Sequence, residues 1–126
     1  MGDMLVMTPQ DRADLGKLTS RLVSALHPEH IILFGSRAWG TPTKYSDWDL
    51  LVIVAHSILP PYQRAVQAHH AIGPLPIPVD VIVKTTEEYD ALKVIRGSMD
   101  YKIANEGLSI YERGKDQTRQ GLAEQI

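Results

Sequence analysis

The segment from Trp48 to Val54 constrains the fold of this chain most, because it is almost continuously apolar and rich in valine and isoleucine. A short run of this composition is typical of a central strand that is covered on both faces. Two similar runs, Ile31–Phe34 and Ile77–Val83, predict two more strands. The sequence therefore predicts a sheet that is packed against other elements on each side.

Segments with helical signals lie before, between and after these runs. Thr8 to Asp11 has the residues of a helix start, and leucines then recur at helical spacing until His27-Pro28, where the helix should end. Three further helices are predicted: one from Pro60-Pro61 to Ile72, one that starts at Thr85 to Glu88, and one from Met99 to Asn105. An edge strand is predicted at Leu108–Tyr111. Strands that alternate with helices predict an α/β fold whose ligand binds at the carboxyl ends of the strands.

The length of 126 residues and the hydrophobic content of 44% suit one compact domain. We assign this domain to residues 1–112, because the composition beyond Glu112 turns polar and charged. Residues 113–126 are predicted to form a weakly ordered tail or a docking segment. No apolar run approaches the ~20 residues that span a bilayer, and the first residues do not look like a secretory signal, so a cytoplasmic protein is expected.

The composition also restricts the partners and the chemistry. The chain has 13 basic and 15 acidic residues and a net charge of −2, which argues against a long nucleic acid as its partner. It has no cysteine, which excludes a disulfide framework, a thiolate metal site and a thiol nucleophile. Any metal ion must therefore be bound by oxygen or imidazole ligands.

A glycine-containing loop from Gly35 to Gly40 follows the first predicted strand directly. Glycines let backbone amides approach a phosphate closely, Ser36 adds a hydroxyl donor, and Arg37 offers a bidentate phosphate contact. The predicted nucleotide-binding residues are Gly35, Ser36, Arg37 and Gly40. A glycine-serine pair after a strand also occurs in ordinary turns, so the loop alone leaves a plain turn open.

Asp47 and Asp49 lie two residues apart on the second predicted strand, so their side chains should project from the same face. Two adjacent carboxylates repel each other unless a cation neutralises them, and hard oxygen ligands suit Mg²⁺ or Mn²⁺. The alternative is that Asp47 caps a turn after Ser46 and that Asp49 stands at a solvated strand edge. The pair alone does not decide between these two interpretations.

Asp80 stands between Val79 and Val81 in an otherwise apolar strand, where an unpaired carboxylate would be costly to desolvate. It either marks a strand end in water or faces a cation that it shares with Asp47 and Asp49. Three carboxylates beside a triphosphate-binding loop are the arrangement expected for two-metal phosphoryl transfer. In that arrangement, Asp80 ligates the second ion and accepts the proton of an attacking hydroxyl.

Four residues in or near these motifs have two interpretations each. Trp39 and Trp48 either stack on a nucleobase or pack at the edge of the sheet. Lys44 and Lys84 either contact phosphate or stand in solvent, which is the usual place for a lysine.

Taken in order, the motifs resemble those of a known superfamily. They consist of Gly35-Ser36 through Gly40, Ser46 to Val52, and Val79-Asp80-Val81. They are similar to the signature of the nucleotidyltransferase superfamily, which includes DNA polymerase beta and kanamycin nucleotidyltransferase, and the likeness is closest to its minimal members. The resemblance implies an α/β (α+β) core with a small mixed β-sheet flanked by helices. The metal-binding and catalytic residues that it implies are Asp47, Asp49 and Asp80, beside the phosphate-binding residues Gly35 and Ser36.

The resemblance also implies an activity, cofactors and partners. It implies transfer of a nucleoside monophosphate, here AMP from ATP, to a hydroxyl group with the help of two Mg²⁺ ions or of Mn²⁺. Minimal members are often encoded beside a small helical HEPN-type protein, and in some toxin–antitoxin pairs they transfer AMP to a tyrosine of that partner. Two alternatives stay open: an antitoxin that occludes its partner, and a transferase that modifies a small molecule such as an antibiotic. A core of this size has no room for an acceptor domain, so the acceptor must present itself or a homo-oligomer must complete the site.

Overall fold

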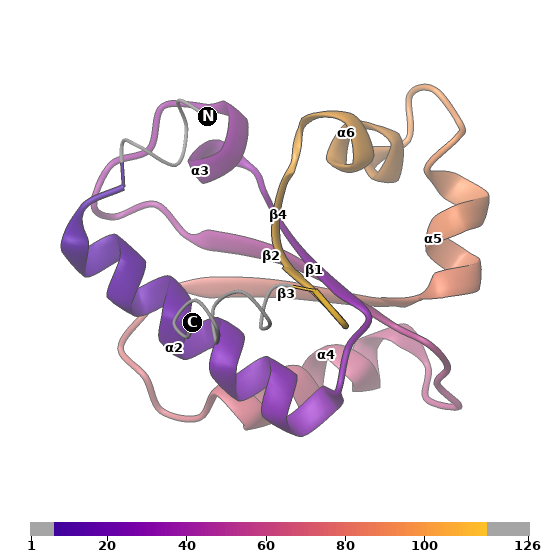
Figure 1. The fold of residues 1–126 in the computed structure, drawn as a ribbon, viewed down its shortest axis with the longest axis horizontal. Coiled ribbons are helices and arrows are strands. Elements are labelled where there is room, and N and C mark those ends of the chain that lie inside the picture. The colour runs from indigo at the N-terminus through magenta and orange to yellow at the C-terminus, as the bar shows by residue number, and fades with distance from the viewer. Residues whose placement is uncertain (1–6, 116–126) are drawn as a thin grey trace.

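A four-stranded mixed sheet lies at the centre of the computed structural model, which describes residues 7–115 (Figure 1). Its strands are β1 (His30–Phe34), β2 (Trp48–Val54), β3 (Val79–Thr85) and β4 (Leu108–Glu112), in the order β3-β2-β1-β4. β1 pairs antiparallel with β2 and with β4, whereas β2 and β3 are parallel. The small mixed sheet expected from the sequence is thus confirmed.

Helices cover both faces of this sheet. They are α2 (Pro9–Leu26), α3 (Ser36–Trp39), α4 (Pro61–Ile72), α5 (Thr86–Leu92) and α6 (Met99–Glu106). α2 and α4 lie against one face, and α5 and α6 lie against the other (Figure 1). α3 is a short helix that follows β1 directly. Within residues 7–115, no helix has the length and apolar character needed to cross a membrane.

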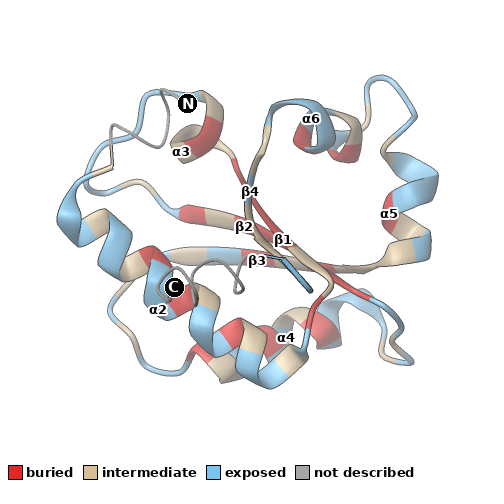
Figure 2. Ribbon diagram, in the orientation of Figure 1, coloured by how far each residue is buried: buried red, intermediate tan, exposed pale blue. Residues whose placement is uncertain are grey.

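The hydrophobic core lies on both sides of β2, as the apolar run predicts. Toward α2 and α4, this strand directs Trp48, Leu50, Val52 and Val54, and toward α5 and α6 it directs Leu51 and Ile53. Figure 2 shows the buried residues along the central strands and on the sides of the helices that face them. The central strand is therefore covered on both faces, and its one polar residue, Asp49, comes at its start.

Alternation along the strands decides which face each polar residue of β2 and β3 shares. Asp49 is on the same face as Leu51, which packs in the core beneath α5 and α6. In β3, Val81 packs in the core beneath α2 and α4, so Asp80 and Lys84 lie on the α5 and α6 face. The two aspartates consequently share one face of the sheet.

α2 begins and ends where the sequence predicts. Thr8 caps its first turn and forms a reciprocal capping box with Asp11, and Pro9 is the first helical residue. At the other end, His27 adopts a left-handed conformation with a φ of 48°, and its N–H donates to the carbonyl of Val23 at 3.0 Å. The helix therefore stops by a left-handed turn one residue before Pro28.

The third strand is Val79–Thr85 and not Ile77–Val83 as predicted. The residues before it include Pro76 and Pro78, which have no N–H group to donate to a strand ladder. The carbonyl of Pro78 can still accept a hydrogen bond, and it accepts one of 2.9 Å from the N–H of Trp48. At its other end the strand continues to Thr85, which caps α5 in a second capping box.

The predicted domain boundary falls where β4 ends, at Glu112. Arg113 still contacts the body of the protein, because its N–H donates to the carbonyl of Glu29 at 2.9 Å and its guanidinium lies 3.3 Å from the carboxylate of Glu29. Residues 116–126, which make up most of the predicted tail, lie outside the described residues. The interpretation of this tail therefore stays a prediction.

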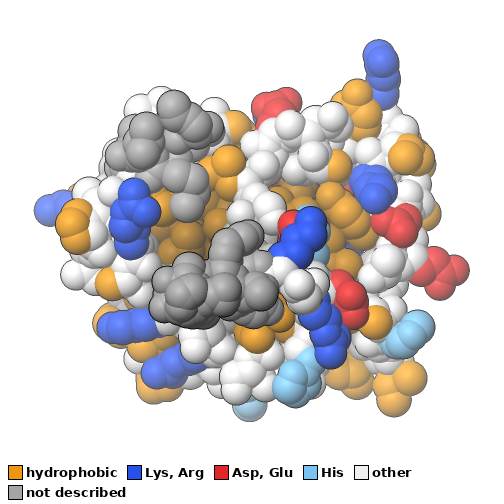
Figure 3. Space-filling model, viewed as in Figure 1, with side chains coloured by type: hydrophobic (Ala, Val, Ile, Leu, Met, Phe, Trp, Pro, Cys, Tyr) orange, Lys and Arg blue, Asp and Glu red, His pale blue; other side chains and the backbone are white. Residues whose placement is uncertain are grey.

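Charged side chains are spread rather than gathered over the described part of the face drawn in Figure 3. On the face drawn in Figure 3, basic side chains lie between acidic, apolar and uncharged ones. No continuous basic stripe crosses the described part of this face, although such a stripe is what tracks a nucleic-acid backbone.

Candidate functional site

The Gly35 loop, Asp49 and Asp80 lie at the same end of the sheet. Because β1 and β2 are antiparallel, Phe34 at the end of β1 pairs with Asp49 at the start of β2. Because β2 and β3 are parallel, Asp49 in turn pairs with Asp80 at the start of β3. The Gly35 loop thus follows the carboxyl end of β1, where the sequence predicts it, whereas Asp49 and Asp80 stand at the amino ends of β2 and β3. Hydropathy located the strands but carries no information about their relative direction.

Two glycines shape the loop that leaves β1. Gly35 has a φ of 78°, a left-handed conformation that favours glycine, and a Cβ atom there would overlap Oδ2 of Asp49. The N–H of Gly40 donates to the carbonyl of Ser36 at 3.0 Å, and a Cβ at Gly40 would come within 2.9 Å of the Ser36 Cα. Glycine at position 35 therefore allows the predicted phosphate loop to lie directly against Asp49, and glycine at position 40 allows the chain to pack closely against Ser36.

Asp47 and Asp80 act electrostatically on Asp49. Asp49 is half-buried, whereas Asp47 and Asp80 are exposed. The pKa of Asp49 is raised above its ordinary value, first by burial and then by the negative charges of Asp80 and Asp47. One reason for singling out Asp80 is thereby corrected, because this residue meets water at the start of β3 and the desolvation penalty falls on Asp49 instead.

The donor chemistry of this cluster fits a divalent cation. Mutual repulsion favours a bound positive charge, and carboxylate oxygens are the ligands that Mg²⁺ and Mn²⁺ prefer. As the side chains are placed, however, no three His, Asp or Glu residues within positions 7–115 are gathered closely enough to hold a metal ion. The residues that would hold it are Asp47, Asp49 and Asp80, after the exposed Asp47 and Asp80 turn toward Asp49.

Arg37, predicted to contact phosphate, has other partners in this structure. Its Nε and Nη2 donate to the carbonyl of Ser46 at 3.1 and 3.0 Å, and Nη2 also donates to the carbonyl of Thr43 at 3.2 Å. Nη1 lies 3.5 Å from Oδ1 of Asp11, and the side chain is only 7% exposed. A phosphate contact from Arg37 remains a prediction, and in this structure its Nε and Nη2 already donate to backbone carbonyls.

The two tryptophans of the motifs occupy different environments. Trp48 is 1% exposed and lies under the Arg37 guanidinium, whose Cζ is 4.1 Å from the ring centroid, so Trp48 packs rather than offering a free face. Trp39 is half-buried beside Phe34, and Nζ of Lys102 lies 4.6 Å from its ring centroid. Sequence reasoning did not single out Lys102, because a lysine on a predicted helix carries no signal of this contact.

The two lysines considered as phosphate ligands also differ. Lys44 is exposed, and its Nζ lies 5.2 Å from the ring centroid of Tyr45. Nζ of Lys84 donates to both carboxylate oxygens of Asp100, at 2.9 and 2.7 Å, and Asp100 is 2% exposed. Lys84 therefore ties β3 to the first turn of α6, which is a structural role.

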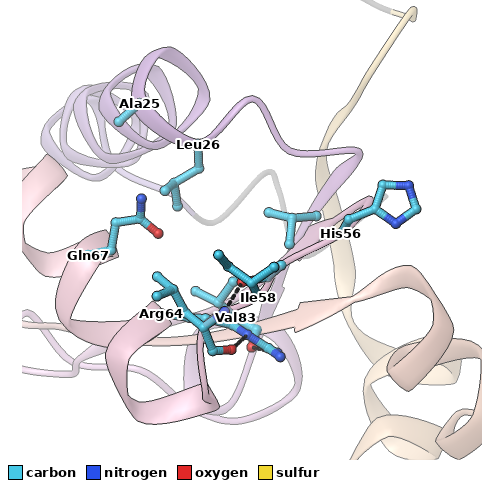
Figure 4. Close-up of a pocket in the computed structure, with 10 residues that line it drawn as sticks. Ala25, Leu26, His56, Ile58, Arg64, Gln67 and Val83 are labelled. Carbon is cyan, nitrogen blue, oxygen red and sulfur yellow. Dashed lines mark hydrogen bonds between the residues drawn. The ribbon is translucent and has the colours of Figure 1, made fainter.

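Two cavities lie at opposite ends of the sheet. A cavity of 420 Å³ adjoins the site on its α2 side and is lined partly by Arg37 and Trp48. A second, of 450 Å³, lies beyond the other end of β2, where Figure 4 shows Arg64 and Gln67 of α4 near Ile58 of the following loop. Neither of these two cavities is lined by the three aspartates. Asp47 and Asp80 are exposed to solvent, whereas Asp49 is half-buried.

Comparison with known proteins is consistent with this geometry. A sequence model of the family described as nucleotidyltransferase domain matches residues 15–105, a range that includes the Gly35 loop and all three aspartates. The crystal structure of a predicted nucleotidyltransferase from Sulfolobus solfataricus is similar, with a TM-score of 0.58, 23% sequence identity and a match that covers 81% of each chain. At this identity the likeness establishes a shared fold. Among curated proteins, none matches this chain.

Proposed function

This chain belongs to the nucleotidyltransferase domain family, and we propose that it transfers a nucleoside monophosphate, AMP from ATP, to a hydroxyl group. The observation that carries the proposal is the convergence of the Gly35 loop with Asp49 and Asp80 at one edge of the sheet. A phosphate held by the loop would lie beside the carboxylates, where the reaction needs compensation of negative charge.

The proposed reaction balances as follows. The acceptor oxygen attacks the α-phosphorus of the triphosphate, and the bond from that phosphorus to the oxygen bridging the α- and β-phosphates breaks. Pyrophosphate leaves with the bonding electron pair, and the proton of the acceptor hydroxyl passes to the carboxylate of Asp80. Backbone amides of the loop and the hydroxyl of Ser36 would hold the leaving phosphates in line with the attacking oxygen. Asp80 is exposed at the start of β3, which leaves it accessible to an acceptor.

Divalent ions, either Mg²⁺ or Mn²⁺, would neutralise the phosphate charges and lower the pKa of the acceptor hydroxyl. The full site would hold two of them. Asp47 and Asp49 would hold the ion nearer the triphosphate, with Asp80 completing the second site. The raised pKa of Asp49 supports this assignment, because burial and the negative charges of Asp80 and Asp47 all oppose the ionisation of this carboxylate, and a bound cation would offset them.

The preference for ATP and the identity of the acceptor rest on the resemblance to minimal nucleotidyltransferases. We propose as acceptor a tyrosine of a small helical HEPN-type protein, so that the pair would form a toxin–antitoxin system. Residues 7–115 form one sheet with its covering helices, and an acceptor on a separate molecule would reach the carboxylates at the exposed Asp80. A second copy of this chain that completes the site is the alternative arrangement.

A transfer assay tests the proposal. The purified protein is incubated with Mg²⁺, each of the four nucleoside triphosphates labelled at the α-phosphate, and the helical protein encoded beside it. We expect label from ATP on a tyrosine of that protein, release of pyrophosphate, and loss of both signals in Asp49→Asn. Glu88→Gln, at the opposite end of the sheet, should keep both signals.

Two outcomes would change the assignment. If none of the four triphosphates labels an acceptor or releases pyrophosphate, the proposed activity is contradicted. If the double variant Asp47→Asn/Asp49→Asn still neutralises the partner as well as the wild type does, occlusion replaces nucleotide transfer as the mode of action.

A further inference from the structure

Arg37 joins the phosphate loop to the segment that carries the carboxylates, and we propose that it is a positioning residue for the metal-binding aspartates. The proposal rests on the proposed function, because it assigns a role within that same site. Arg37 follows Ser36 directly in the loop, yet its side chain turns away from the loop toward Thr43 and Ser46. Its backbone therefore belongs to the phosphate loop, while its side chain bonds to the segment before Asp47.

The segment before Asp47 has few other constraints. Residues 41–47 form no helix or strand, and most of them are exposed. Within this segment, the N–H of Thr43 donates to the Ser46 hydroxyl at 2.9 Å, and the N–H of Ser46 donates to the carbonyl of Thr43 at 3.1 Å. Arg37 adds three hydrogen bonds to the two carbonyls of this turn, at 3.0 to 3.2 Å. The guanidinium thus fixes the chain immediately before the first carboxylate.

A second contact extends this constraint to the other two aspartates. The guanidinium of Arg37 stacks on Trp48, which stands between Asp47 and Asp49 in the sequence. The N–H of Trp48 donates to the carbonyl of Pro78 at 2.9 Å, two residues before Asp80. Arg37, Trp48 and Pro78 therefore form a continuous series of contacts behind the three carboxylates.

The chemistry of arginine suits this role better than that of lysine. A planar guanidinium has donors in a fixed geometry, so one side chain can bond two carbonyls and stack on a ring at the same time. Because the Arg37 side chain is almost completely buried, its guanidinium is held in one position. Partners that orient metal ligands in this way commonly contribute about 10-fold to 100-fold in metal affinity.

Two separate titrations distinguish positioning from phosphate binding. Mn²⁺ alone is titrated with detection of the free ion by electron paramagnetic resonance, and ATP alone is titrated by calorimetry with a chelator present. For Arg37→Lys and Arg37→Met, we expect Mn²⁺ affinity to fall about 10-fold or more, whereas affinity for metal-free ATP changes less than about threefold.

Arg64→Lys is the matched control. Arg64 is equally buried, with 7% exposure, and also bonds to carbonyls and a carboxylate, but it lies at the opposite end of the sheet. We expect its melting temperature to fall while both affinities stay at the wild-type values. All titrations are run well below the melting temperature of each variant, and Arg37→Lys carries the test if Arg37→Met does not fold.

Each other outcome has a definite meaning. A fall in ATP affinity with unchanged Mn²⁺ affinity makes Arg37 a phosphate ligand and overturns the positioning role. Wild-type affinities for both probes in folded Arg37 variants also overturn it, because only a structural role is then left. If the wild type itself binds neither Mn²⁺ nor ATP, the proposed function fails and the positioning role fails with it.

Discussion

Each end of β2 has an arginine with a buried side chain that holds a loop. Arg37 lies at the near end, where the strand begins at Trp48, and Arg64 lies beyond the far end, where it stops at Val54. The charges around the two arginines are arranged differently. Beyond the far end, Arg64 donates to Glu88 at 2.7 and 3.1 Å and to the carbonyl of Leu59 at 2.7 Å. There the pKa of Glu88 is lowered to about 2, chiefly by its hydrogen bond with Arg64. At the near end, the pKa of Asp49 is raised instead, by burial and by two neighbouring carboxylates.

This difference in pKa distinguishes a carboxylate that stabilises the fold from one that is suited to bind a cation. Glu88 has a cation beside it and is most stable ionised, so it contributes to the fold without any ligand. Asp49 has like charges beside it, so the near end is electrostatically strained in a way that a bound cation would relieve. A carboxylate cluster that opposes its own ionisation is a candidate for binding, whereas a satisfied ion pair is not.

The largest expected difference between the two ends concerns activity. Asp49→Asn should lower nucleotide transfer by more than about 100-fold, because it removes a metal ligand. Without metal, its free energy of unfolding should be unchanged or slightly higher, since repulsion among the carboxylates is relieved. Transfer assays and urea unfolding with a chelator measure the two effects.

Glu88→Gln is the counterpart at the far end. It should leave transfer within about twofold of the wild type and lower the free energy of unfolding by about 1–2 kcal/mol, because Arg64 loses its charged partner. Glutamine can still complete the capping box with Thr85, so the helix start is kept. Loss of nucleotide transfer in Glu88→Gln would contradict the proposal that only the near end of β2 takes part in the reaction.

Two glycines with similar backbone conformations sharpen the comparison. Gly35 has a φ of 78° and Gly73 a φ of 72°, so alanine is strained at both positions by about 1 kcal/mol or more. At Gly73 the Cβ would meet only the side chain of Arg21, at 3.1 Å, whereas at Gly35 it would overlap Asp49. Gly35→Ala should therefore abolish metal-dependent ATP binding, and Gly73→Ala should reduce only the melting temperature. Equal ATP binding by the two variants would contradict the close approach of loop and carboxylate.

The smallest effect is an opposite response of the two ends to acid. The pKa of Glu88 is about 2 in the folded state against an ordinary 4.5, so its ion pair stabilises the fold above pH 4.5. This stabilisation is lost as the pH falls toward 2, because the unfolded chain binds the proton first. Asp49 behaves in the opposite way, because its raised pKa makes protonation favour the folded state as the pH falls.

Urea unfolding of the metal-free protein between pH 7 and 3 measures this contrast. Glu88→Gln should lose less stability on acidification than the wild type, by about 1 kcal/mol or less, because the Glu88 side chain is 41% exposed and screened by solvent. Asp49→Asn should lose more, since it lacks the carboxylate that protonation relieves. Parallel pH profiles for the two variants would show that the charge contrast does not affect stability.

The sequence predicted the helices and strands better than their arrangement. The apolar run of β2 predicted the central strand, because hydropathy is a local pattern. The spacing of Asp47, Asp49 and Asp80 singled out three carboxylates, of which the structure pairs Asp49 with Asp80, and their role stays a prediction. Local patterns cannot show that β1 runs antiparallel to β2, and so the end of the sheet that carries the site was only partly predicted. The start of β3 was misplaced because its apolar run continues through two prolines that cannot donate to the ladder.

The roles of the two arginines were also beyond sequence reasoning. Arg37 bonds to the carbonyl of Ser46 and approaches Asp11, which lies 26 positions earlier in the chain. Arg64 bonds to Glu88, 24 positions later. Every residue has a backbone carbonyl, so residue type cannot show which carbonyl an arginine will bond to. An ion pair between distant elements depends on how those elements pack. The position of Arg37 within the glycine loop pointed to phosphate, and only its partners suggest a different role.

Calorimetric titration of ATP in the presence and absence of Mg²⁺ tests the central claim most directly. It compares the wild type with Asp47→Asn/Asp49→Asn, and with Glu88→Gln as the control at the far end. The site described at the start of β2 and β3 predicts Mg²⁺-dependent binding to the wild type and the control, and loss of that binding in the double variant. Equal binding by the double variant, or no binding of any nucleoside triphosphate to the wild type, would contradict it.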